Sequence, residues 1–103
     1  MQNDKIDILI VDDDKTLCKM LEDMLSKEAH LNVTSAHDGL DATQKIKGKK
    51  FDLILTDLMM PGVDGIEVLR VAKEIDDNVN VIIVTGFASL ETAMEAIKKG
   101  AYD

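Results

Sequence analysis

Residues 51–62, with the sequence FDLILTDLMMPG, constrain the fold of this chain more than any other stretch. Residues 53–55 form a continuous apolar run, which is typical of a strand buried on both faces of a parallel sheet. Asp57 follows this run, and Pro61-Gly62 marks a loop just beyond it. Open α/β sheets bind ligands at the carboxyl ends of such strands. Asp57 is therefore a candidate functional residue, and a cap of the next turn is the alternative.

Strand and helix patterns alternate along the chain. Apolar runs predict strands over residues 5–11, 31–36, 53–57 and 79–84. Amphipathic spacing predicts helices over residues 15–27, from 39 onward, over 64–75 and over 89–99. The apolar residues expected on the inner faces of the first three helices are Leu17, Met20, Leu21, Met24, Leu25, Leu40, Ala42, Ile46, Ile66, Leu69, Ala72 and Ile75. With right-handed crossovers, this order predicts one α/β domain over residues 1–103, built on a doubly wound parallel sheet.

The charge of the chain excludes several classes of partner. The 103 residues carry a formal net charge of −8, and the one basic cluster, at positions 45, 47, 49 and 50, lies around the end of a helix. This composition argues against binding of nucleic acid or anionic membranes by this segment. No apolar run approaches the length of a transmembrane helix, and the N-terminus lacks the pattern of a signal peptide.

The single cysteine, Cys18, excludes an intramolecular disulfide and fits a reducing cytoplasm. We expect Cys18 to be a half-buried helix residue. His30 and His37 have no cysteine or histidine partner at metal-binding spacing, and we expect both at the surface.

Polar side chains follow three of the predicted strands. Residues 12–14 are all aspartate, Asp57 ends the third strand, and Thr85 follows the fourth. Because parallel strands point the same way, these groups are expected at one edge of the sheet. If the first and third strands are neighbours, Asp12, Asp13 and Asp57 share one pocket.

Three consecutive aspartates repel one another, so another interaction must offset their charge. The start of the next helix accounts for one or two of them, with Asp14 as the N-cap, and the third requires a cation. Carboxylate ligands select Mg²⁺, with Mn²⁺ as an alternative. The Asp57 carboxylate can accept a phosphoryl group as a nucleophile. Thr85 offers a hydroxyl to that phosphate, or it simply closes a strand.

The stretches VDDD, LTDLMMPGVDG, VIIVTG and ETAMEAIKKGAYD resemble the receiver domain of two-component response regulators. The resemblance runs from near Lys5 to the last residue. It implies a flavodoxin-like fold with strand order 2-1-3-4-5, of which this chain contains the first four strands in the order 2-1-3-4. The fourth helix and the GAYD ending most resemble receivers of σ54-activator (NtrC-type) regulators, which implies an ATPase and a DNA-binding domain beyond residue 103.

The resemblance also implies roles for individual residues. Asp57 would be the phosphoacceptor, Asp13 would bind Mg²⁺ directly, and Asp12 would hold it largely through water. Met59 would contribute its backbone carbonyl, and Thr85 would be the switch hydroxyl. The donor would be a sensor histidine kinase or a phosphotransfer protein in the cytoplasm, and the output would be control of transcription. The chain would accept a phosphoryl group without being a turnover enzyme.

Two departures from the family pattern alter these expectations. Family members carry a lysine at the end of a fifth strand, and this chain stops before it, at Asp103. The fourth strand, which begins near Val79 and ends at Val84, would then be a sheet edge that pairs with a second copy or exchanges elements with it. Mg²⁺ binding should survive, whereas phosphorylation lacks one flanking cation. The apolar Met59 and Phe87 predict a long-lived phosphate, because they exclude water.

Two other functions fit parts of the sequence. The stretch ILIVDDDKTL matches the D-x-D-x-T signature of haloacid-dehalogenase-type phosphatases, with Asp12 as nucleophile and Asp14 as acid and base. That assignment leaves Asp57 and the MMPG loop unexplained. The third alternative is a degenerate receiver that acts only as an interaction module.

Overall fold

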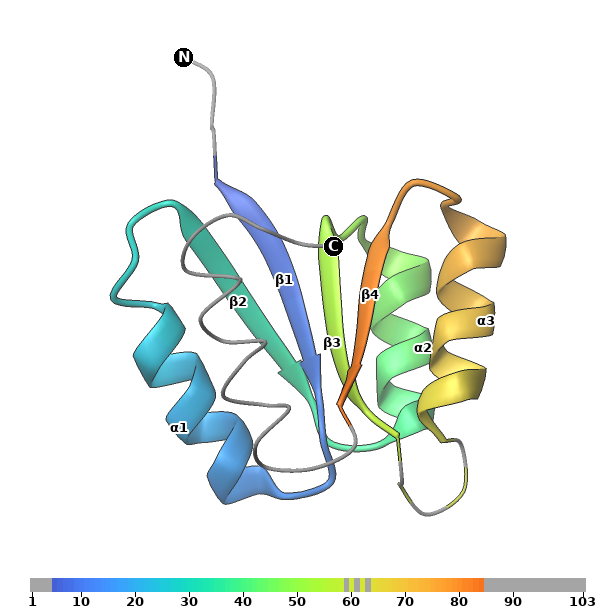
Figure 1. Ribbon diagram of the computed structural model, residues 1–103, viewed down its shortest axis with the longest axis horizontal. Coiled ribbons are helices and arrows are strands. Elements are labelled where there is room, and N and C mark those ends of the chain that lie inside the picture. The colour runs from blue at the N-terminus through green and yellow to red at the C-terminus, as the bar shows by residue number, and fades with distance from the viewer. Residues whose placement is uncertain (1–4, 59, 61, 63, 85–103) are drawn as a thin grey trace.

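The computed structural model describes residues 5–58, 60, 62 and 64–84, and Figure 1 shows their arrangement. The strands are β1 (Ile6–Val11), β2 (Leu31–Ala36), β3 (Leu53–Asp57) and β4 (Asn80–Val84). All neighbouring pairs are parallel, in the order β2-β1-β3-β4. This confirms the predicted doubly wound sheet, and the predicted strand ends agree with the observed ones to within a residue.

Helices cover both faces of the sheet. The helices of the described residues are α1 (Lys15–Leu25), α2 (Gly39–Gly48) and α3 (Gly65–Ile75). Figure 1 shows α1 on one face of the sheet and α2 and α3 side by side on the other. Successive residues of β1 therefore enter different cores: Ile8 and Ile10 pack with α1, whereas Leu9 and Val11 pack with α2 and α3. This is the reason that the strand is apolar without alternation.

Each helix begins at an aspartate that caps it. The Oδ1 atoms of Asp14, Asp38 and Asp64 accept hydrogen bonds from the backbone N–H three residues later, at 3.0, 2.7 and 3.0 Å. Such caps satisfy amide groups that have no partner within the helix. The expected N-cap role of Asp14 is thereby confirmed.

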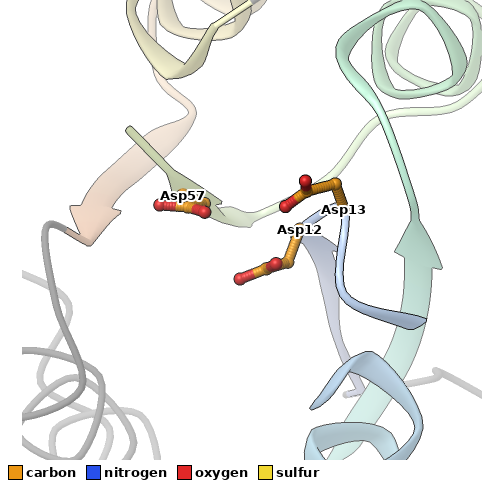
Figure 2. A group of neighbouring side chains, drawn as sticks. All are labelled: Asp12, Asp13 and Asp57. Atoms are coloured by element: carbon orange, nitrogen blue, oxygen red, sulfur yellow. The ribbon is translucent and has the colours of Figure 1, made fainter. Parts of the chain in front are cut away.

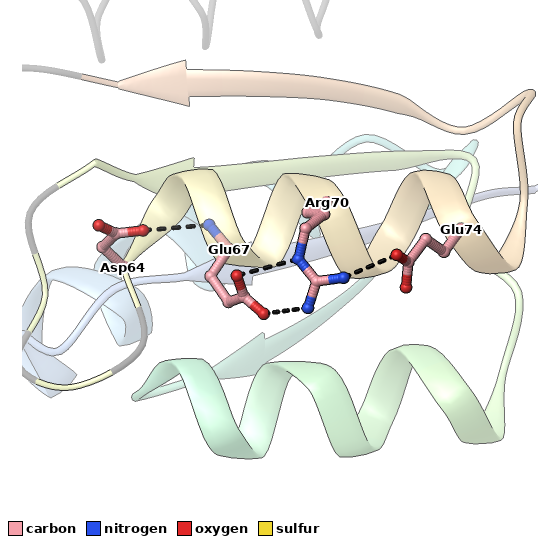
Figure 3. A network of polar contacts seen from close by, with 4 residues as sticks. All are labelled: Asp64, Glu67, Arg70 and Glu74. Carbon is pink, nitrogen blue, oxygen red and sulfur yellow. Dashed lines mark hydrogen bonds and ion pairs between the residues drawn. The ribbon is translucent and has the colours of Figure 1, made fainter.

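The outer face of α3 carries a network of charged side chains (Figure 3). Arg70 donates from Nε to Glu67 at 3.0 Å, makes a second hydrogen bond to Glu67, and reaches Glu74 at 2.6 Å. The hydrogen bond from Arg70 lowers the pKa of Glu67. Because all these side chains are exposed, the network contributes little to stability and mainly keeps this face in solvent.

The inner faces of the helices differ from the sequence prediction. Met20, Met24, Leu40, Ile66 and Ile75 are between 39% and 62% exposed and do not face the sheet. The buried residues of α1, α2 and α3 follow the same spacing in each helix: Cys18, Leu21 and Leu25; Gly39, Ala42 and Ile46; Gly65, Val68 and Ala72. In each helix the first of these three residues is small, cysteine or glycine, and the larger apolar residues listed above lie outside the buried spacing.

The remaining predictions for side chains were partly correct. Cys18 is fully buried and not half-buried, whereas His30 is exposed and His37 is partly exposed. The expected helix over residues 89–99, and Met59, Thr85 and Phe87, lie outside the described residues. Among the helices that the structure describes, none has the length and hydropathy needed to cross a membrane.

Candidate functional site

Three carboxylates meet at the carboxyl edge of the sheet. One oxygen from each of Asp12, Asp13 and Asp57 lies within 4.8 Å of the others. Figure 2 shows the three side chains at this edge of the sheet. Asp12 and Asp57 are half-buried and Asp13 is exposed. The convergence expected from neighbouring first and third strands is therefore present.

Strand register brings these acids together across more than forty positions of sequence. Val11 pairs with Thr56 where β1 and β3 lie side by side, so Asp12, directly after β1, and Asp57, the last residue of β3, are each the next residue along the chain. Asp57 also pairs with Val84 on β4. The connections from β1 to β2 and from β3 to β4 run in opposite directions across the sheet. Open α/β sheets form a ligand-binding crevice at the point where this direction changes, which here lies between β1 and β3.

Asp12 is held by several hydrogen bonds. Its backbone N–H donates to the carbonyl of Ala36 at 3.1 Å, and its own carbonyl accepts from the Cys18 thiol at 3.3 Å. Its Oδ1 accepts from the backbone N–H of Asp14 at 2.9 Å. These contacts hold the backbone and one carboxylate oxygen of Asp12 in place directly after β1.

The electrostatics of the site favour a cation. Burial raises the pKa of Asp12, the hydrogen bond from Asp14 opposes this shift, and the negative charges of Asp57, Asp13 and Asp14 add to it. A raised pKa means that the surroundings of a carboxylate do not offset the cost of its negative charge, which a bound cation would do. The three acids supply oxygen ligands only, which suits Mg²⁺ better than softer metals. The residues present therefore fit a Mg²⁺ site.

Cys18 lies beneath this site, and its thiol is expected to be unreactive. Burial raises the pKa of its thiol to about 11, and the nearby charge of Asp12 adds to the shift. The thiol is thus protonated at neutral pH and has little nucleophilic character. Its role in the described structure is to fill the core under α1 and to donate to the Asp12 carbonyl.

The loop between β3 and α3 is closed by backbone hydrogen bonds. The Leu58 N–H donates to the Val84 carbonyl at 3.0 Å, and the Gly65 N–H donates to the Leu58 carbonyl at 3.0 Å. Sequence reasoning missed both Leu58 and Gly65 as residues that shape the site. The signal that points to Gly65 is the pattern Asp-Gly-apolar-acid, which occurs at residues 38–41 and again at 64–67.

The structure gives Asp14, which the phosphatase alternative requires as acid and base, the role of a helix cap. Asp14 caps α1 through its carboxylate and is not a member of the acidic group, whereas Asp57 is a member. The D-x-D pair of that alternative therefore does not account for the site that is observed. Of the expected site residues, Asp12, Asp13 and Asp57 are brought together, while Met59 and Thr85 fall outside the described residues.

Comparison with known proteins agrees with this geometry. The model of the response regulator receiver domain family matches residues 8–103. The transcriptional regulatory protein ZraR of Klebsiella oxytoca is 41% identical over 103 residues, which is 100% of this chain and 23% of the relative. The sporulation initiation phosphotransferase F of Bacillus subtilis is 39% identical over 98% of this chain and 79% of its own length.

A solved structure gives the same result. A response regulator receiver domain protein from Clostridium thermocellum superposes with a TM-score of 0.73 at 30% identity, covering 93% of this chain and 77% of that one. The chain spans less than a quarter of the ZraR relatives, so their other domains have no counterpart in the comparison. The family model, the relatives and the fold agree, and the chain belongs to the response regulator receiver domain family.

Proposed function

We propose that this receiver domain takes a phosphoryl group from a histidine kinase or a phosphotransfer protein onto Asp57. The observation that carries the proposal is the meeting of Asp57 with Asp12 and Asp13, whose carboxylate oxygens lie within 4.8 Å of one another. Asp57 is the half-buried last residue of a strand whose other residues are buried, so the sheet positions its carboxylate. Phosphoryl transfer requires mainly positioning and charge neutralisation.

The transfer of the phosphoryl group from the donor to Asp57 needs no further reactant. An Asp57 carboxylate oxygen forms a bond to phosphorus, and the bond between phosphorus and the donor nitrogen breaks with its electron pair left on the imidazole. Asp13 would bind Mg²⁺ directly, Asp12 would hold it through water, and Met59 would add its backbone carbonyl. When bound, Mg²⁺ neutralises the charge that the acids and the phosphoryl oxygens share.

Thr85 is the proposed switch residue. It follows Val84, whose carbonyl accepts from the N–H of Leu58 next to the acceptor. On this proposal, its hydroxyl would bond the phosphoryl oxygens once they are attached. The output would be control of transcription, as the name of the ZraR relatives describes for those proteins. On this proposal, the chain acts in the cytoplasm as a phosphoacceptor and performs no turnover.

Replacement of Asp57 by Asn tests the proposed function. With acetyl phosphate and Mg²⁺, we expect phosphate incorporation into the wild type, detected by intact mass, and none into Asp57→Asn, because the amide is not a nucleophile. The matched control is Asp77→Asn, the same change at an exposed loop residue. It should be labelled like the wild type.

The labelled residue decides between the alternatives. A phosphate that maps to Asp12 and persists in Asp57→Asn would establish the phosphatase-type assignment instead. Absence of any label, together with Mg²⁺ binding and unchanged binding to a kinase, would identify a degenerate receiver.

We further propose that β4 pairs with a second copy of the chain. β4 is the last strand in the order β2-β1-β3-β4, and its outer edge has no partner strand among the described residues. Exposed strand edges recruit other chains through their free N–H and C=O groups. We expect the mass from light scattering to rise with protein concentration, through edge pairing or exchanged elements. A constant monomer mass at high concentration would contradict this proposal.

A further inference from the structure

Gly65 lies against the backbone of the acceptor strand. A Cβ atom at this position would be 2.4 Å from the carbonyl oxygen of Asp57 and 2.9 Å from the Cα of Leu58. Ordinary contacts of a Cβ begin at 3.4 Å, so any side chain at Gly65 must move this backbone by about 1 Å. Both neighbouring atoms belong to the main chain, which cannot swing aside as a flexible side chain would.

The same contact is part of a hydrogen-bonded connection. The Gly65 N–H donates to the Leu58 carbonyl, and the Leu58 N–H donates to the Val84 carbonyl, each at 3.0 Å. These two bonds join the first turn of α3, the residue after the acceptor and the end of β4. The bond from Gly65 to Leu58 also joins the two ends of the segment between β3 and α3, and the bond from Leu58 to Val84 ties one of those ends to β4.

We propose that Gly65 is a positioning residue for the acceptor, and that the connection from Gly65 through Leu58 to Val84 sets where Asp57 stands relative to the metal site and to β4. This inference rests on the proposed function, since Asp57 is the group whose position is set. Gly65 contributes no reacting group. It acts because only the absence of a side chain lets α3 approach the carbonyl of Asp57 closely.

The first test is Gly65→Ala. At saturating Mg²⁺ and a temperature well below unfolding, we expect the rate of phosphorylation by acetyl phosphate to fall by about 10- to 100-fold, as is typical of a 1 Å displacement of a reacting group. The affinity for Mg²⁺, measured by titration of the folded protein, should fall as well. A residue with a merely structural role would leave both quantities unchanged in the folded state.

Two other glycines supply matched controls. A Cβ at Gly48, the last residue of α2, would meet nothing within 4 Å, so Gly48→Ala should leave phosphorylation unchanged. Gly62 lies in the same loop as the connection and has a φ of 79°, but also has open space around it. Gly62→Ala strains the backbone without pressing on Asp57, and separates loop strain from contact with the acceptor.

Hydrogen exchange in the wild type tests the connection without a variant that has to fold. The Leu58 and Gly65 amides should exchange at least about ten-fold more slowly than the Gly62 amide, which makes no backbone hydrogen bond to the other described residues. Rapid exchange at Leu58, or wild-type phosphorylation and Mg²⁺ affinity in folded Gly65→Ala, would overturn the inference. Persistent labelling of Asp57→Asn would instead overturn the proposed function, so the two failures are distinguishable.

Discussion

Leu55→Ala should lower the free energy of unfolding by about 2–5 kcal/mol, the range seen for leucine truncation in a packed core. Leu55 is 2% exposed and lies on β3, between β1 and β4, in the core beneath α1. Truncation there removes apolar contacts and leaves a cavity that the neighbouring strands cannot close, because both are held in the sheet. Urea denaturation monitored by circular dichroism measures the change.

Leu40→Ala is the matched control for this prediction. The chemical change is the same, but Leu40 is 62% exposed on the first turn of α2. We expect a change within about 0.5 kcal/mol, as is usual for surface sites. If the two variants lost equal free energy of unfolding, Leu40 would have to face inward, as the sequence predicted. That result would contradict the exposed position of Leu40 in the structure.

Mg²⁺ should stabilise the folded domain strongly. A ligand that binds only the folded state at a hundred-fold excess over its Kd raises the free energy of unfolding by about 2.7 kcal/mol. The acids that would bind it, Asp12, Asp13 and Asp57, meet only in the folded state, because β1 and β3 must pair first. Thermal unfolding across a Mg²⁺ titration should show a rising Tm in the wild type and a much smaller rise in Asp13→Asn.

Without the metal, the charge of Asp12 should reduce stability. Its pKa is raised in the folded state by burial, so its contribution to stability is greatest below the unfolded value of 3.8 and is lost as the pH rises through the folded value. Asp12→Asn removes this loss while keeping the oxygen that accepts from Asp14. At pH 7 and without Mg²⁺, we expect this variant to be more stable than the wild type.

The size of that gain is under about 1 kcal/mol, since solvent screens a half-buried carboxylate. Asp77→Asn, at an exposed loop position, is the control and should change nothing measurable. The difference between wild type and Asp12→Asn should shrink as the pH falls through the folded pKa and then below 3.8, because Asp12 becomes protonated first in the folded and then in the unfolded state. A difference that is independent of pH, or a less stable Asp12→Asn, would contradict the electrostatic account.

The regular elements and the position of the acids followed from the sequence alone. Continuous apolar runs predicted β1 and β3 because a strand covered on both faces has no polar face to alternate with. Asp14 was predicted as a cap because capping is a local interaction between a carboxylate and an amide three residues away. The meeting of Asp12, Asp13 and Asp57 required only parallel strands with β1 beside β3.

Only the tertiary structure determined the rotation of the helices and the connection at Gly65. The apolar residues of α3 span a wide stripe, so periodicity permitted Ile66 to face the sheet, where Val68 and Ala72 are found instead. In the structure, α3 is oriented so that Gly65 lies close to the Asp57 carbonyl. A glycine has no side chain and adds nothing to a hydrophobic pattern. The requirement for glycine becomes apparent only when the backbone of another segment lies where a side chain would be.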